Sequence, residues 1–154
     1  MNQPLKRAPE LIPLSRDHHH ALMLCWKIRQ GIAKNVDANR IMQYASWFFI
    51  NHLQPHFELE EKKIFTLPGV GHATVDQAIG EHAQLRLLFN KQPNIELLST
   101  IEKTLEHHVR FEERVLFVEV QKNTPPELLN KINLEENTRP FKDNLNDIFW
   151  AETT

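Results

Sequence analysis

The chain has 154 residues, 41% hydrophobic and 25% charged, which is ordinary for one soluble globular domain with a real core. Its net charge of −2, with scattered basic residues, argues against nucleic acid or an anionic membrane as the main partner. The single cysteine excludes an internal disulfide. The sequence has neither the apolar core of a signal peptide nor an apolar run of roughly 20 residues that could span a membrane, so we expect a soluble, cytoplasmic protein.

Apolar residues recur with helical periodicity along most of the chain, and the low count of four glycines also favours helices over strands. We predict four long helices, each opened by a residue that can cap it. They run from Ser15 to about Lys34, from Asp37 to about Phe65, from the Thr74–Gln77 capping box to about Gln92, and from Asn94 to just before Pro125. A shorter helix is expected from Pro126 to Glu136, and one or two helical turns between Phe141 and Trp150.

Short connections between four helices favour an all-α fold, namely an antiparallel up-down-up-down four-helix bundle with a short C-terminal helical extension. We predict one domain over residues 1–154, with a bundle core at about 14–122 and the extension at about 125–150, packed as a lid over the bundle end. Pro55 lies inside the second helix and cannot donate a backbone hydrogen bond to the carbonyl of Asn51. It therefore predicts a kink just before the next residue.

Two segments share the form H-x-x-x-E-E-x-x-[IL]-F, beginning at His56 in the second helix and at His108 in the fourth. Residues four apart share a helix face, so each segment directs one imidazole and one carboxylate the same way. The first glutamate of each motif, Glu60 or Glu112, lies about 40° around the helix from its histidine, and the second about 140° away. The second glutamates, which we expect to face away from the interior, are Glu61 and Glu113.

Helix phase also sorts the other histidines. In the first helix His18 shares the apolar face, whereas His19 occupies a border position and His20 is expected to be solvated. In the third helix His82 is the inward histidine, and in the fourth His107 lines up with polar residues and is expected to be solvated. Each of the four helices therefore supplies one inward histidine.

A lone inward histidine is more often a hydrogen-bonded core residue than a ligand, but two carboxylates among four histidines would make a poor core without a cation. We therefore predict a metal site. Its candidate ligands are His18, His56, Glu60, His82, His108 and Glu112, with His52 and His19 as additional candidates, either as ligands or as groups that hydrogen-bond to them.

Histidine and carboxylate ligands without thiolate suit iron, and also manganese or zinc. Six protein ligands exceed what one tetrahedral zinc uses, and two glutamates from opposing helices can each bridge two ions. The donor set therefore predicts two iron ions in a carboxylate-bridged site. Cys25 is expected to be a small core residue.

The order of these motifs, with Asp-His in the first helix, H-x-x-x-E-E in the second, Glu-His in the third and H-x-x-x-E-E in the fourth, resembles the hemerythrin-like family of HHE cation-binding domains. The resemblance covers about residues 14–120. It implies a four-helix bundle holding a non-haem di-iron centre that binds dioxygen or senses redox state. Carried over by position, the four inward histidines would be terminal ligands, and Glu60 and Glu112 would be bridging ligands.

Two departures separate the chain from the oxygen-carrying hemerythrins. Those proteins have two histidines four apart in the third helix, but Ala78 and Arg86 flank His82 at that spacing here. They also have His-x4-Asp in the fourth helix, where this chain has His-x3-Glu. The site is thus closer to the broader HHE group than to the oxygen carriers.

The leading functional hypothesis is a di-iron protein that interacts with dioxygen, peroxide or nitric oxide, and that is a metal- and oxygen-binding protein rather than a classical enzyme. An apolar wall would favour an apolar diatomic ligand, and its expected members are Leu22, Phe48, Phe49 and Phe89. The alternatives are iron storage, handling or sensing without catalysis, and a metal-stabilised interaction module. The sequence does not set the oligomeric state.

Overall fold

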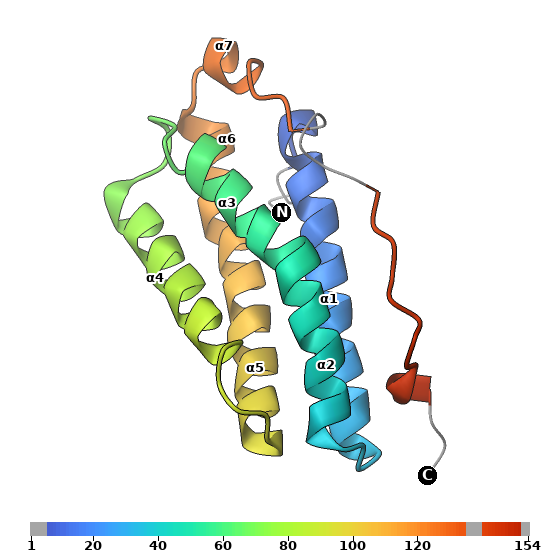
Figure 1. Ribbon diagram of the computed structural model, residues 1–154. Helices are drawn as coiled ribbons and strands as arrows, with labels where there is room; N and C mark the ends of the chain where they lie inside the picture. The colour runs from blue at the N-terminus through green and yellow to red at the C-terminus, as the bar shows by residue number, and fades with distance from the viewer. Residues whose placement is uncertain (1–5, 135–139, 152–154) are drawn as a thin grey trace, which may run out of the picture.

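The computed structural model describes residues 6–134 and 140–151, and every regular element within those ranges is a helix. The predicted all-α class is confirmed. The first and third long helices are α1 (Ile12–Ala33) and α4 (His72–Leu88). The second is α2 (Ala38–Phe48), η2 (Phe49–Leu53) and α3 (Gln54–Lys63) in succession, and the fourth is α5 (Ile95–Phe111), η3 (Glu112–Leu116) and α6 (Phe117–Asn123). These four segments lie side by side (Figure 1).

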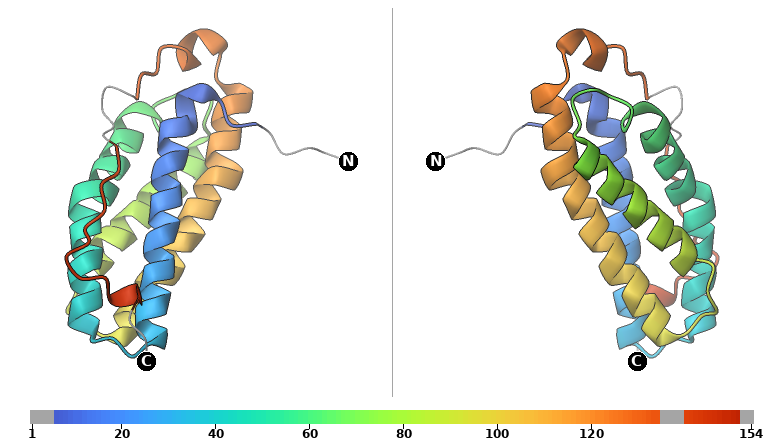
Figure 2. Two further views of the ribbon diagram at one scale, coloured as in Figure 1. Left: turned by 90° about the vertical axis from the view of Figure 1, so that its right-hand side faces the viewer. Right: turned by 90° about the vertical axis from the view of Figure 1, so that its left-hand side faces the viewer.

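Three short helices complete the described chain: η1 (Pro9–Leu11), α7 (Pro126–Leu129) and η5 (Phe149–Ala151). The two C-terminal expectations are confirmed only in part: α7 begins at Pro126 and η5 is the one helical turn near Trp150. The helix after Pro125 is shorter than predicted, and Glu135 and Glu136 lie outside the described residues. Residues 140–148 have no regular helix, and this segment runs along the side of α1 and α2 instead of covering the bundle end (Figure 2). None of the described helices is long and apolar enough to cross a membrane.

Two of the four predicted caps are confirmed. Asp37 accepts a hydrogen bond from the backbone N–H of Asn39, and Asn94 accepts one from that of Leu97. Ser15 is not a cap, because α1 begins at Ile12 and the Ser15 hydroxyl donates to Glu113. The hydroxyl that was expected to cap the first helix is therefore bound elsewhere.

The start of α4 also differs from the prediction. It begins at His72 and not at Thr74, whose hydroxyl donates to Glu119 of α6. Its buried stripe includes Ala78, His82 and Leu85, whereas Ile79 is 46% exposed.

Two π-helical turns interrupt the second and fourth helices. In η2 the N–H of Gln54 donates to the carbonyl of Phe49, five residues back, just before Pro55. The expected disturbance at Pro55 therefore takes the form of a widened turn. The second widened turn, η3, begins at Glu112 and was not anticipated. The first turn ends shortly before one copy of the repeated motif, and the second lies inside the other copy. Such π turns often occur at functional sites.

The core consists of two apolar clusters. The larger includes Leu24, Ile28, Ile41, Phe48 and Leu105. The smaller includes Leu11, Ile64, Leu116 and Phe117. A polar layer separates them: in α1, His18 has Leu14 of the smaller cluster on one side and Ala21 of the larger cluster on the other. The corresponding triplets on the other helices are Phe57, Glu60 and Ile64; Ala78, His82 and Leu85; and Val109, Glu112 and Leu116.

Gly31 marks the closest approach of α1 to α2 and η5. A Cβ atom there would lie 2.7 Å from Cδ1 of Ile41 and 2.9 Å from Cε1 of Phe149, and both neighbours are fully buried. We therefore expect Gly31→Ala to lower the free energy of unfolding by about 1 kcal/mol, because overpacking outweighs the gain in helix propensity. Thermal and urea unfolding measure this change.

Gly80 in α4 is the matched control, because nothing lies within 4 Å of a Cβ atom there. Gly80→Ala should raise the free energy of unfolding by about 1 kcal/mol through helix propensity alone. Equal stabilisation by the two substitutions would contradict the close approach at Gly31.

Candidate metal centre

Six side chains meet in the polar layer between the two apolar clusters. They form two groups whose ligand atoms all lie within 4.8 Å of one another. One group is His18, His56, Glu60 and Glu112, and the other is Glu60, His82, His108 and Glu112. All six residues are at most 4% exposed. These buried groups could hold a metal ion, and the two glutamates belong to both groups.

All four imidazoles direct Nε2 toward the two central carboxylates. Oε1 of Glu112 lies 2.8 Å from Nε2 of His18 and 3.3 Å from Nε2 of His108. Oε1 of Glu60 lies 3.1 Å from Nε2 of His56 and 3.3 Å from Nε2 of His82. The i,i+4 pairing within each motif therefore places His56 beside Glu60 and His108 beside Glu112.

The opposite ring nitrogen, Nδ1, of each histidine contacts a carboxylate from a neighbouring helix. The four pairs are Asp17 with His56 at 2.9 Å, Glu61 with His82 at 2.7 Å, Glu81 with His108 at 2.7 Å, and Glu113 with His18 at 2.6 Å. We call these four acids the outer carboxylates. An Nδ1–H that donates to a carboxylate leaves Nε2 as the free donor atom that a metal requires.

The outer carboxylates form a closed ring around the centre. Each adjoins an inner residue in the sequence and reaches to the next helix: α1 to α3, α3 to α4, α4 to α5, and η3 back to α1. As expected, Glu61 and Glu113 belong to neither of the two inner groups. They do not simply face solvent, however. Each is 29% exposed, yet each hydrogen-bonds to a buried histidine.

Further contacts hold the outer carboxylates in place. The guanidinium of Arg86 donates two hydrogen bonds to Glu61, at 2.9 and 3.0 Å. Glu113 accepts from the hydroxyl of Ser15 and from Arg7. The sequence signal for this ring was present in the Asp-His, Glu-His and Glu-Glu pairs, but helix phase only placed Glu61 and Glu113 away from the interior and gave Asp17 and Glu81 no partner.

Several buried polar atoms of the centre have no hydrogen-bond partner. They are Nε2 of His56, both carboxylate oxygens of Glu60 and Oε2 of Glu112, which are four of the five such side-chain atoms among the described residues. The His56–Glu60 pair is close, but its geometry makes no hydrogen bond. Leaving buried groups unpaired is costly, and a cation bound by these atoms would remove the cost. The donor set therefore fits a metal ion.

Without a metal, the buried carboxylates and imidazoles favour each other's charged forms, and a bound cation would take the place of the protons on Nε2. Burial on its own lowers the pKa of a histidine, but Glu112 and Glu81 raise the pKa of His108 to about 10. In the same way Glu60 and Asp17 outweigh burial and raise the pKa of His56 well above 6.5. Burial works to raise the pKa of Glu112, but the histidines hold it well below its usual value. Glu112 is thus a carboxylate, the form that binds cations.

The remaining histidines lie outside both groups. His107 is 71% exposed, as predicted. The prediction for α1 was reversed: His19 is exposed, whereas His20 is half-buried because it stacks on Phe141. His52, an additional candidate, packs against Trp47 and Phe141 and, like His19, joins neither group.

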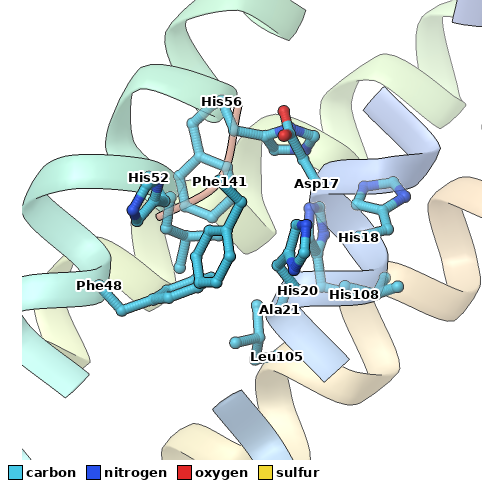
Figure 3. A pocket seen from close by; sticks show the side chains of 13 residues that line it. Asp17, His18, His20, Ala21, Phe48, His52, His56, Leu105, His108 and Phe141 are labelled. Carbon is cyan, nitrogen blue, oxygen red and sulfur yellow. The ribbon is translucent and has the colours of Figure 1, made fainter. Parts of the chain in front are cut away.

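A cavity of about 20 Å³ adjoins the centre (Figure 3). His18, His56 and His108 are among its lining residues, with Phe48 and Leu105 in its apolar wall. This volume is enough for about one water-sized molecule. Of the apolar wall predicted from the sequence, Phe48 lines the cavity. Leu22, Phe49 and Phe89 do not, and the last two stack on each other at 4.6 Å.

No protein-family model matches the chain, and no curated protein or solved structure matches it either.

Removing one outer carboxylate tests its contribution to metal binding. In Glu81→Ala, Nδ1 of His108 loses its acceptor, so the ring is no longer held with Nε2 toward the centre. We expect metal affinity to fall by about 10- to 100-fold, as measured by competition with a chromophoric chelator. Glu58→Ala, at an exposed position of α3, is the control and should leave the affinity unchanged. Equal affinities in the two variants would contradict a positioning role for Glu81.

Proposed function

We propose that this protein is a hemerythrin-like, non-haem di-iron protein whose centre binds dioxygen or another small redox ligand, such as peroxide or nitric oxide. The observation that carries the proposal is that the two four-residue groups share Glu60 and Glu112. In the proposal these two carboxylates bridge two ions. His18 and His56 complete the site of one ion, and His82 and His108 that of the other.

The arrangement of the helices supports the proposal. Figure 1 shows α1 and α4 running opposite to α2–α3 and α5–α6, in agreement with the antiparallel up-down-up-down bundle expected of the family. Ligands from facing helices of such a bundle project into one interior layer.

The donor chemistry supports iron. The six groups provide imidazole nitrogen and carboxylate oxygen, a set that suits iron, manganese and zinc. Thiolate does not contribute: Cys25 is fully buried, its S–H donates to the carbonyl of Glu102, and burial raises its pKa to about 12. Among these metals, zinc has no redox chemistry, and six protein ligands exceed the number that one tetrahedral zinc ion uses. Iron bound here would supply reversible electron exchange with a small ligand.

The cavity supports a small ligand over an organic substrate. Binding sites for drug-sized molecules usually occupy about 300–1,000 Å³. The space beside His18, His56 and His108 is about 20 Å³. Its wall contains Phe48 and Leu105, which would favour an apolar diatomic over water.

Iron storage or handling is the second candidate. The observation that favours it is the ring of outer carboxylates, because Asp17, Glu61 and Glu113 are 29–37% exposed and extend negative charge from the centre toward the surface. Such charge attracts cations.

Metal content and optical spectra separate the two candidates. We expect purified protein loaded with ferrous iron to hold two ions per chain, and to develop near-ultraviolet and visible charge-transfer bands when exposed to air. The measurements are elemental analysis and absorption spectroscopy. Loaded protein that develops no such band would contradict the leading proposal, and release of the iron upon reduction would favour handling.

Replacing a bridging candidate tests the shared carboxylates. Glu60→Met keeps a similar volume but removes an oxygen donor from both groups. We expect iron loading to fall to one ion or fewer per chain. Because Glu60 raises the pKa of the buried His56, its loss leaves that imidazole without its carboxylate partner, and the metal-free variant should unfold at a free energy about 3 kcal/mol lower. Elemental analysis and urea unfolding measure the two effects.

His107→Ala is the matched control, because His107 is an exposed neighbour of a candidate ligand. It should load two ions, as the unmodified chain does. Full loading of Glu60→Met would show that Glu60 does not bridge.

A further inference from the structure

Phe141 closes the outer side of the small cavity. Its ring stacks on His20, with centroids 4.0 Å apart and planes 15° from parallel. It also contacts His52 at 4.7 Å and Phe48 at 6.1 Å. All four side chains line the cavity, and Figure 3 shows Phe141 among the other three.

A second, wider pocket lies on the other side of the segment. It measures about 620 Å³ and shares Asp17, His52 and His56 with the inner cavity. Pro140 and Lys142 line this outer pocket, whereas Phe141 lines the inner one. Successive side chains of an extended segment point to opposite faces, so Phe141 faces the inner cavity while its two neighbours face the outer pocket.

Charged contacts hold the segment that carries Phe141. Asp143 bonds to the buried amine of Lys27 at 2.6 Å and accepts the hydroxyl proton of Tyr44 at 2.6 Å. Farther along, Asp147 accepts two hydrogen bonds from Arg40.

The end of the segment is anchored in the core. Phe149 is fully buried in the larger cluster. The next residue, Trp150, accepts a hydrogen bond from Lys34 at its carbonyl. Polar contacts of Asp143 and Asp147 and the burial of Phe149 thus hold the segment that carries Phe141 against α1 and α2.

We propose that Phe141 is the specificity-determining residue of the metal centre, which admits ligands of two or three atoms and excludes larger ones. The proposal rests on the proposed function for the identity of the ligand. Its geometric basis is independent: Phe141 lines a cavity of about 20 Å³ beside three inner histidines, and its two chain neighbours line a pocket about thirty times larger that shares Asp17, His52 and His56 with the cavity. We expect removal of the ring to join the two spaces beside these shared residues.

The first test uses iron-loaded protein and two probes, azide with three atoms and imidazole with a ring. We expect Phe141→Ala to bind azide about tenfold faster or more in stopped-flow absorption, and to bind imidazole, which the unmodified protein excludes. Phe141→Leu should give an intermediate rate. Leu145→Ala, at a 61% exposed position of the same segment, is the control and should match the unmodified chain. Azide rates within twofold in all four proteins, or imidazole binding by the unmodified protein, would overturn the proposal.

The second test needs no metal. Diethyl pyrocarbonate acylates accessible histidines in their uncharged form. Because neighbouring carboxylates raise the pKa values of these imidazoles, the two proteins are compared at one pH of about 9, and the modified sites are identified by mass spectrometry. In metal-free Phe141→Ala we expect acylation of the cavity-lining His18, His56 and His108 to rise about tenfold, while His82, which does not line the cavity, stays protected. Equal acylation of the cavity-lining histidines with and without the Phe141 ring would overturn the selectivity role. A chain that binds no iron, yet shows the expected acylation, would refute only the proposed function.

Discussion

The burial of Glu60 and Glu112 is the constraint on which the rest of the structure depends. Each carboxylate is fully buried between two apolar clusters, where an unpaired charge is very unfavourable. Four imidazoles face the pair. Three of them, on His108, His18 and His82, outweigh burial and hold the pKa of Glu112 well below its usual value. Even so, both oxygens of Glu60 and one of Glu112 lack a hydrogen bond. The layer is organised for a positive charge beyond those of its own side chains.

The outer carboxylates extend this organisation to the whole set of helices. Each helical segment both provides a carboxylate and receives one at its histidine, so the ring connects four segments that are distant in sequence. The polar layer interrupts the core, and the apolar clusters on either side supply the hydrophobic stabilisation. The two π turns lie at the edges of this layer, at η2 before His56 and at η3 from Glu112 onward. The irregular backbone is therefore found where ligands are positioned.

The C-terminal segment connects the centre to its surroundings. It is held by Asp143, Asp147 and Phe149, whose partners include Lys27 and Gly31 of α1 and Arg40 of α2. Between those anchors and the bundle it places Phe141 over the cavity beside the inner histidines. In the functional proposal, the bundle supplies the metal ligands and this segment supplies the selectivity.

The sequence by itself determined the features that depend on residues close together in the chain. Apolar periodicity predicted the four long helices, and the one-turn spacing within each motif selected Glu60 and Glu112 over their neighbours, because phase within a helix is a local property. Only the tertiary structure decided which neighbouring helix each outer carboxylate reaches and that His20, not His19, is covered. It also decided that residues after Pro140 lie along α1 and α2. These features depend on distances between segments far apart in the sequence, and helix phase does not contain that information.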